Sequence, residues 1–238
     1  MNRNTNEHFA QNPVTIDLPR SRFSRNFDVK GTCNVGDLIP FFATECMPGG
    51  TYSLDTAKVV RMETPMFPFM DRMFMDTYYF FVPWRLVWEH FEDFLGQDSP
   101  DAWSDPVDYT IPFVTAPDET GWANGTIADY FGFPTGVPGI SHTAMLFRCY
   151  AKLVDDWFRD ENLTQHLNIP TNDSDQNGSN GTNYINDIAN GGMPFKVCKS
   201  FDVFTGSLPS PQKGESVQIN LSGLNTGTVS VLSPDKLI

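Results

Sequence analysis

The chain has 238 residues, of which 40% are hydrophobic, and it carries a formal net charge of −13 at pH 7. This composition is typical of a chain that buries a substantial core, and the negative charge disfavours general affinity for nucleic acid. The longest apolar run, around 78–82, is far shorter than the roughly 20 residues that a membrane-spanning helix needs. We therefore expect no membrane partner.

Residues 1–26 are predicted to form an extended N-terminal arm, because Pro13 and Pro19 interrupt any helix and no apolar period is sustained. The arm is also more basic than the rest of the chain. Residues 1–30 carry a net charge of +2, which leaves −15 for the remainder. The sequence thus predicts a mildly basic arm followed by an acidic body.

The arm contains a candidate contact for nucleic acid, in which basic side chains surround an aromatic ring: Arg20, Arg22, Phe23 and Arg25. Cations pair with phosphates and rings stack on bases, so this mixture suits a single strand of nucleic acid. An ordinary strand edge with alternating exposed arginines accounts for the same pattern. The sequence leaves both interpretations open.

Residues 27–82 are predicted to form β-strands, because strand-length runs rich in β-branched and aromatic residues alternate with turn signals. The turn signals are the segment 34–37 and the Pro-Gly-Gly sequence at 48–50. In the second of them, the glycines can supply the positive φ that a tight hairpin turn requires. The last of these runs, 72–82, becomes apolar on both faces, as in a strand that is covered on both sides.

Residues 83–194 are predicted to be an insertion that carries helices. Apolar residues recur at helical spacing near 84–95 and again near 142–160. A short helix is expected near 126–131, where Thr126 and Asp129 have the spacing of a capping box. Residues 171–183 are rich in asparagine and glycine and are predicted to form a loop.

Residues 195–238 are predicted to return to strands. The fold class that follows is mainly β with helical insertions. So few strands leave sheet edges unpaired, and we therefore expect the architecture to be incomplete, with the strands truncated at the end of the chain.

Two motifs suggest chemistry, and each has a simpler explanation. Asp173 to Gly178 has the spacing that begins a calcium-binding loop, but Tyr184 stands where the bidentate glutamate is expected, which favours a surface loop. His90 has Glu89 beside it and Glu92 and Asp93 close by, which could suggest acid–base chemistry. On a helix, however, these three carboxylates form a solvated charged face. No spacing typical of an active site occurs. We expect no enzyme, catalytic residue, metal or cofactor.

Five stretches occur in a defined order between Phe27 and Gly214: FDVKGTCNVGDLIPFF, DTYYFFVPWRLVWEHF, GTIADYFGFPTGV, WFRDENL and LPSPQKG. Together they resemble the major capsid protein of microviruses, and most of all its gokushovirus branch, a group of small single-stranded DNA phages. The resemblance implies a viral jelly roll, which is a β-sandwich or barrel of two packed sheets, with its first strands at 27–82. Family members are longer, so the later strands are expected to be missing here.

The resemblance also implies a function. It describes a structural subunit that self-assembles into an icosahedral T=1 capsid around a circular single-stranded DNA genome. The implied partners are further copies of the subunit, other virion and scaffolding proteins, and the DNA genome. The implied location is the virion capsid, assembled in the cytoplasm of the host bacterium. The main alternative is a carbohydrate-binding jelly-roll module that uses exposed tryptophan and tyrosine rings as sugar platforms.

A second set of candidate residues follows from the aromatic content of the predicted helices. Large aromatic side chains dominate both cores and protein interfaces. A long, proline-rich insertion cannot easily cover all of its own apolar surface. The following five residues are therefore predicted to lie in the core or at a subunit interface: Trp84, Trp88, Phe91, Trp157 and Phe158.

Overall fold

The structure is a computed structural model. It describes residues 19–70, 72–96, 103, 107–198, 203, 204 and 206, and the backbone of 217–219 and 229–231. The chain divides into two units, Met1–Gly31 and Thr32–Ile238. In the first unit the described residues, 19–31, have no helix or strand and are exposed. Predicted features in residues 1–18 lie outside the described residues.

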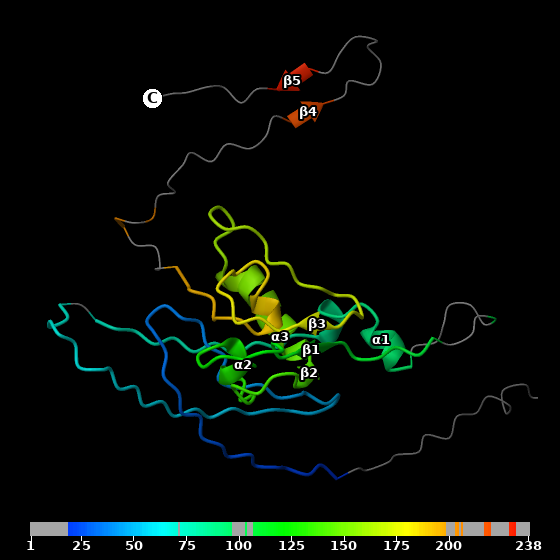
Figure 1. Cartoon of the computed structure of the whole chain (residues 1–238), viewed down its shortest axis with the longest axis horizontal. Coiled ribbons are helices and arrows are strands. Elements are labelled where there is room, and N and C mark those ends of the chain that lie inside the picture. The colour runs from blue at the N-terminus through cyan, green and yellow to red at the C-terminus, as the bar shows by residue number, and fades with distance from the viewer. Residues whose placement is uncertain are drawn as a thin grey trace, which may run out of the picture. The chain divides into compact units, whose positions relative to one another are not determined.

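The described part of the second unit is mostly non-helical and holds a small mixed sheet, which is compatible with the β-rich class that the sequence predicts (Figure 1). The strand order is β2-β1-β3, with β1 antiparallel to β2 and parallel to β3. The strands of this sheet are β1 (Phe113–Thr115), β2 (Ser141–Thr143) and β3 (Gln176–Asn177). The short β3 thus lies inside the predicted asparagine- and glycine-rich loop.

The helical segments are short and lie between 84 and 190. They are η2 (Trp84–Leu86), α1 (Phe91–Phe94), α2 (Ile127–Tyr130), α3 (Met145–Leu153), η3 (Val154–Phe158) and η4 (Ile188–Asn190). A separate antiparallel pair joins β4 (Val217–Ile219) to β5 (Val229–Val231), within the range predicted to return to strands.

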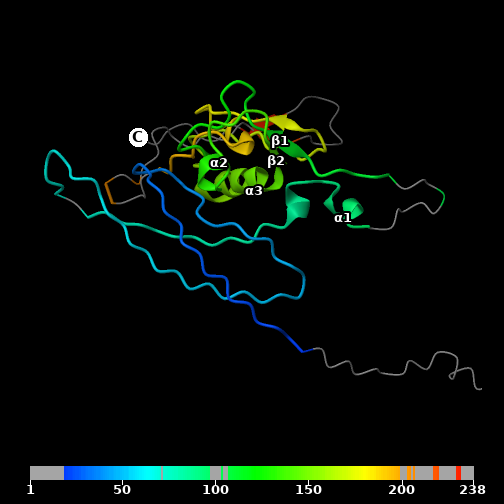
Figure 2. The same ribbon diagram turned by 60° about the horizontal axis from the view of Figure 1, so that its bottom comes forward.

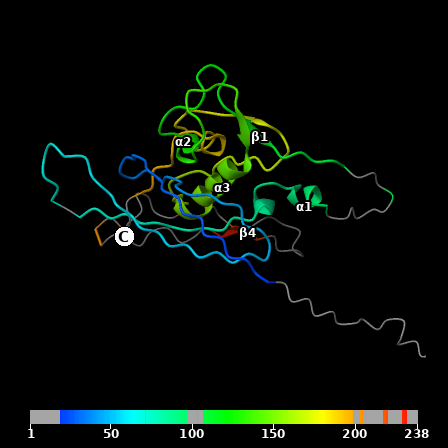
Figure 3. The same ribbon diagram turned by 90° about the horizontal axis from the view of Figure 1, so that it is seen from below.

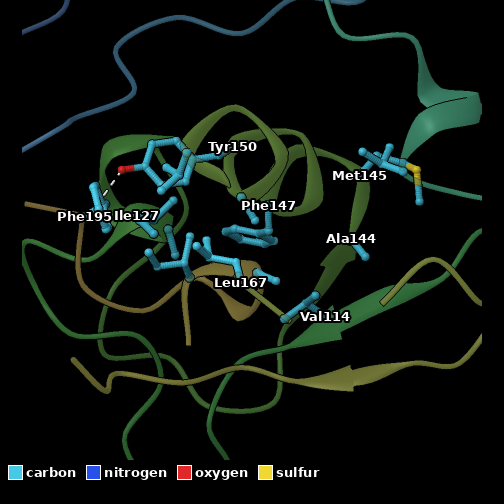
Figure 4. Packing of buried hydrophobic residues seen from close by; sticks show 14 of the residues in the cluster. Val114, Ile127, Ala144, Met145, Phe147, Tyr150, Leu167 and Phe195 are labelled. Carbon is cyan, nitrogen blue, oxygen red and sulfur yellow. Dashed lines mark hydrogen bonds between the residues drawn. The ribbon is translucent and has the colours of Figure 1, made fainter. Parts of the chain in front are cut away.

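One hydrophobic cluster forms the core (Figure 4), and α3, which lies near α2 and β1 (Figure 3), contributes several of its residues. Val114 of β1, Phe147 and Tyr150 of α3, Ile127 of α2 and Leu167 all belong to this cluster. Burying a side chain of this size contributes roughly 1.5–3 kcal/mol. The core therefore gathers residues from most of the segment 84–195 around one helix.

The buried face of α3 agrees in part with the apolar stripe of the segment 142–160. Phe147, Tyr150 and Val154 of that stripe are buried, whereas Leu146 and Leu153 are only partly buried. Beside the stripe, Met145, Arg148 and Ala151 are also fully buried, and Nη1 of the arginine donates to backbone carbonyls. The buried face is therefore wider on one side than the apolar pattern indicates.

The start of α2 has the cap that the sequence predicts. The Thr126 hydroxyl accepts a hydrogen bond from the backbone N–H of Asp129 (3.3 Å), and the Asp129 carboxylate accepts one from the N–H of Gly125 (2.7 Å). These bonds satisfy N–H groups that a helix start leaves without partners. A motif of four residues thus determined the helix start through local contacts alone.

The helix predicted near 84–95 is interrupted. It forms η2 and α1, and residues 87–90 between them are not regular helix. At the break, the N–H of Glu89 bonds to the carbonyl of Thr171 (3.1 Å) and not to a carbonyl of the preceding turn. A contact with a distant loop therefore competes with the local helical pattern and divides it.

The strands predicted for 27–82 remain a prediction, because the described residues of this range are extended without forming a ladder. Within the described residues of this range, the only β-contact is a bridge between Asp37 and Lys196. Residues 51–62 and 72–82 run as long extended traces (Figure 2, cyan). An extended run becomes a strand only when a partner lies about 4.8 Å away to complete the ladder, and no backbone hydrogen bond joins 51–62 to 73–82.

Both predicted turns in this range are present. Gly50 N–H bonds to Met47 O (3.1 Å) with Gly49 at φ +76°, and Asp37 N–H bonds to Asn34 O (3.3 Å) with Gly36 at φ +89°. A positive φ is costly for residues with a side chain and nearly free for glycine. Turn chemistry was therefore predictable where strand pairing was not.

The buried Tyr150 hydroxyl joins two segments that are far apart in the sequence. It donates to the carbonyl of Leu38 (2.5 Å) and accepts from the N–H of Phe195 (3.3 Å, Figure 4). Leu38 N–H also bonds to Phe195 O (2.8 Å), and the ion pair of Lys196 with Asp37 (2.9 Å) closes the contact. Burial raises the pKa of Tyr150, so the hydroxyl stays protonated and able to donate.

Candidate functional site

Four aromatic rings form a cluster that we call the aromatic patch: Tyr78, Phe80, Trp157 and Phe158. The first two lie on the extended segment 72–82, and the other two lie on η3. Phe80 contacts both rings of η3, with centroid distances of 5.7 Å to Trp157 and 5.9 Å to Phe158, and Tyr78 lies 5.5 Å from Phe158. The patch thus joins two segments that are about 80 residues apart in the sequence.

The rings of the aromatic patch are uncovered to an unusual degree. Trp157 is 70% exposed, Tyr78 55% and Phe80 37%. Only Phe158 packs in part against the core. Single exposed apolar residues are normal on a protein surface, but a contiguous group of rings marks a site of interaction.

A tight ionic cluster holds the end of η3. The Asp155 carboxylate accepts hydrogen bonds from Arg159 Nε (2.9 Å), Leu167 N (3.0 Å) and His166 Nδ1 (3.1 Å). Partial burial alone would raise the pKa of Asp155. The hydrogen bonds from Leu167 and His166 and the positive charge of Arg159 outweigh that effect, so the pKa lies below its usual value. This cluster fixes the backbone that carries Trp157 and Phe158.

The lowered pKa of Asp155 predicts a loss of stability in acid. The folded state binds the proton more weakly than the unfolded state, so the contribution is complete above the unfolded pKa of about 3.9 and is lost as pH falls through the lower folded value. We expect Asp155→Asn to flatten the dependence of the urea midpoint on pH between about pH 5 and pH 2. Asp156→Asn is the matched control, because this carboxylate is exposed and pairs with the partly exposed cation Lys152 (2.8 Å). Parallel curves for Asp155→Asn and the unmodified protein would contradict the assignment.

The remaining predicted aromatic residues, Trp84, Trp88 and Phe91, follow shortly after Pro83 in the sequence. Trp88 is fully buried in the core. Trp84 and Phe91 pack against the core while partly exposed, and their rings lie 5.6 Å apart. The structure therefore separates the five predicted residues into a group near the core (Trp84, Trp88 and Phe91) and a group in the aromatic patch (Trp157 and Phe158).

The loop that resembles a calcium site is used for packing. Asp173 accepts from the indole Nε1 of Trp88 (2.6 Å) and bonds to His90 Nδ1 (2.9 Å), and Asp175 accepts from the N–H of Phe113 (2.9 Å). Partial desolvation alone would raise the pKa of Asp173, but its hydrogen bonds with Trp88 and His90 and the charges of His90 and Arg148 lower it. Across the residues that the structure describes, no group of three or more His, Cys, Asp or Glu is placed to hold a metal ion.

Arg148 is a buried charged residue that the sequence analysis did not single out. Its side chain is fully buried, and Nη1 donates to the carbonyls of Asn172 (3.0 Å) and Val87 (3.3 Å). Desolvation by burial is the largest effect and lowers the Arg148 pKa, while the charges of Asp173 and Asp175 act in the opposite direction. A charged residue between Met145 and Ala151, at helical spacing from both, was the available signal. Arg148 joins three segments through these bonds and fills a structural role.

Other titratable groups do not converge in the described part of the chain. His90 stacks on Tyr109 (4.2 Å) and His142 stacks on Phe133 (4.0 Å), while His166 pairs with Asp155. Burial raises the pKa of the Cys149 thiol to about 12, so this thiol stays protonated and is a poor nucleophile. Among the described helices, none has the length and apolar character to cross a membrane.

The predicted nucleic-acid contact lies in the first unit. Arg20, Arg22 and Arg25 are exposed, and the ring of Phe23 is 83% exposed. The side chains are therefore accessible to a partner in the described structure. Their binding of DNA stays a prediction.

Comparison with known proteins gives a consistent result. A family model described as capsid protein (F protein) matches residues 12–233. The chain is 40% identical over 207 residues to the capsid protein VP1 of Spiroplasma virus 4, 41% over 216 residues to that of Bdellovibrio phage phiMH2K, and 37% over 234 residues to that of Chlamydia phage 1. These alignments cover 87%, 90% and 94% of the chain, but only 37–38% of each relative. The chain therefore spans less than two fifths of the length of these relatives.

Proposed function

The chain belongs to the capsid protein (F protein) family, and from this membership we propose that it is part of a structural subunit that assembles into a small icosahedral shell. The observation that carries the proposal is the family match over residues 12–233, together with 37–41% identity to three viral capsid proteins. Members of this family are structural proteins and not enzymes. The working location that follows is the phage virion.

We propose a jelly roll as the fold of the complete subunit, and the contacts of residues 51–82 support it. The hydroxyls of Tyr79 and Thr56 form a hydrogen bond, and Lys58 Nζ donates a hydrogen bond to the hydroxyl of Thr77 (2.5 Å). The pairs 56–79 and 58–77 alternate with the period of two that strands have. The partners also step in opposite directions along the two segments, as directly opposite residues of antiparallel neighbours do, so these contacts support pairing of the two segments within one sheet.

The uncovered apolar surface of these segments is a second support. Between Val59 and Phe81, most large apolar side chains are exposed, and several exceed 90%: Val59, Met66 and Met70. Such a surface is unfavourable for an isolated molecule in water and is covered in the working state of a protein. A subunit that packs into a β-sandwich and against neighbouring copies provides that cover.

Electron microscopy of the product of the complete gene tests the proposal. We expect closed particles of uniform diameter, because symmetry-related contacts that close on themselves reinforce one another. Sedimentation should show one large species and little free subunit above a threshold concentration. A stable monomer that binds oligosaccharides through exposed rings would favour the carbohydrate-binding alternative and contradict a capsid role.

We include the single-stranded DNA genome and scaffolding proteins as partners in this proposal, with assembly in the cytoplasm of the host bacterium. For DNA, the exposed basic and aromatic residues of the arm are the candidates. Replacing Arg20, Arg22 and Arg25 together with glutamine should reduce the slope of log affinity for single-stranded DNA against log salt by about 2, since each phosphate contact contributes about 0.7. The matched control replaces Arg61, Arg72 and Arg85 instead. An unchanged slope in the arm variant would show that the arginines are an ordinary exposed edge.

A further inference from the structure

The area of the aromatic patch is large enough to matter for association. A tyrosine, phenylalanine or tryptophan side chain buries about 150–250 Å². With the exposed fractions of Tyr78, Phe80 and Trp157, the rings still open to solvent amount to roughly 300–400 Å². A specific interface of standard size buries about 800 Å² on each partner. The patch alone thus provides close to half of one side of a stable interface.

The charges beside the patch indicate what kind of partner fits. Lys152 and Arg159, the cations that flank η3, are already paired with Asp156 (2.8 Å) and Asp155 (2.9 Å). A single strand of nucleic acid needs cations beside the stacking rings to pair with its phosphates, and these two are engaged by carboxylates. Two ion pairs that are closed within the chain instead permit two copies of an acidic protein to approach at η3 without placing these four charges opposite like charges.

The patch is also held in place before any partner arrives. The backbone of η3 closes with a wide-turn bond from Arg159 N–H to Val154 O (2.8 Å), and the Asp155 cluster fixes the following turn. Wide turns of this kind occur mostly as single insertions in helices, frequently at functional sites. Phe80 packs against both rings of η3. A surface that is already ordered loses less conformational entropy on binding.

We propose that the aromatic patch is a contact surface for a second copy of this protein, with Trp157 as its central anchor. The inference rests on the proposed capsid function and assigns one surface to it. Tryptophan is among the residues most enriched at the energetic centres of interfaces, where truncation typically costs 2 kcal/mol or more. The Trp157 ring would be covered by the neighbouring copy, with Phe80 and Phe158 as the walls of the contact.

Site-specific photo-crosslinking tests the contact directly. Benzoylphenylalanine replaces Trp157 in the product of the complete gene, and Trp103, which is 94% exposed, is replaced in the matched control. We expect illumination to give covalent dimers through position 157, with the crosslink mapped by mass spectrometry to a second copy, and little dimer through position 103. Crosslinks from 157 only within the same polypeptide, or to DNA, would overturn the proposal.

A truncation gives an independent readout. Trp157→Ala is expected to raise the concentration at which particles form by at least about tenfold, while Trp103→Ala leaves it unchanged. Near-ultraviolet circular dichroism checks that each variant is folded, and Trp157→Phe replaces Trp157→Ala should the latter misfold. If the unmodified protein forms particles and the folded Trp157 variant forms them at the same concentration, the patch assignment fails while the capsid function stands. If the unmodified protein forms no particles, the proposed function fails, and crosslinking through 157 still decides whether the patch joins two copies.

Discussion

Replacing Trp122 with alanine is expected to destabilise the protein by about 3–5 kcal/mol, the range typical of a buried aromatic residue truncated to alanine. The ring is fully buried and lies between Phe147 (5.8 Å), Phe133 (6.0 Å) and His142 (6.1 Å). Truncation leaves a cavity that these stiff neighbours can only partly fill. Equilibrium unfolding in urea measures the loss as a lower transition midpoint.

The controls for this experiment use the same residue type. Trp103→Ala should change the free energy of unfolding by no more than about 0.5 kcal/mol, because that side chain is exposed. Trp122→Phe should cost much less than Trp122→Ala, because the indole N–H has no hydrogen-bond partner among the described residues and most of the ring volume is kept. A loss below about 1 kcal/mol for Trp122→Ala would mean that this ring is not central to the core.

Gly121→Ala is the second large effect that we expect, at about 2–5 kcal/mol. Gly121 has φ +66°, and a Cβ there would lie 2.5 Å from the backbone nitrogen of Val137 and 2.6 Å from its carbonyl carbon and oxygen. The clash is with backbone, so no side-chain rotation relieves it. The segments on either side are joined by Gly136 N–H to Trp122 O (2.9 Å), and a shift there would also disturb the core.

Gly125→Ala separates the cost of the left-handed backbone from the cost of the clash with Val137. Gly125 has a similar φ of +78°, but nothing lies within 4 Å of the position of its Cβ. We expect this variant to cost about 1–2 kcal/mol, the penalty of left-handed backbone alone. The difference between the two variants then measures the clash with Val137. Equal losses in urea unfolding would show that only the backbone conformation matters at Gly121.

Features set by neighbours in the chain were the ones that the sequence predicted well. The Thr126 cap and the two turns depend on residues within four positions of one another, so local chemistry is sufficient to identify them. The helical pattern near 142–160 also corresponds to α3 and η3 in the structure. Its buried face also includes Arg148, whose Nη1 donates to the distant carbonyl oxygens of Val87 and Asn172, and neighbours in the chain do not indicate those contacts.

Features set by distant partners were not predictable in the same way. The break between η2 and α1 arises from loop 171–173, about 80 residues further along. The same holds for the strands expected in 27–82, whose pairing depends on a neighbour that periodicity cannot identify. In the candidate site, the sequence singles out Trp157 by its bulk, but the exposure of this ring and its contact with Phe80 depend on how η3 meets residues 72–82.

The Tyr150 hydroxyl has a consequence for how the chain acquires its structure. It bonds to Leu38, which lies 112 residues earlier in the chain, and to Phe195, which lies 45 residues later. Both bonds therefore form only when three distant stretches come together. Closing loops of that size costs entropy before the bond returns any energy. The join at Tyr150 is therefore expected to be among the last parts of the molecule to form, and hydrogen exchange at the amide of Phe195 should become slow only after the amides of α3 are protected.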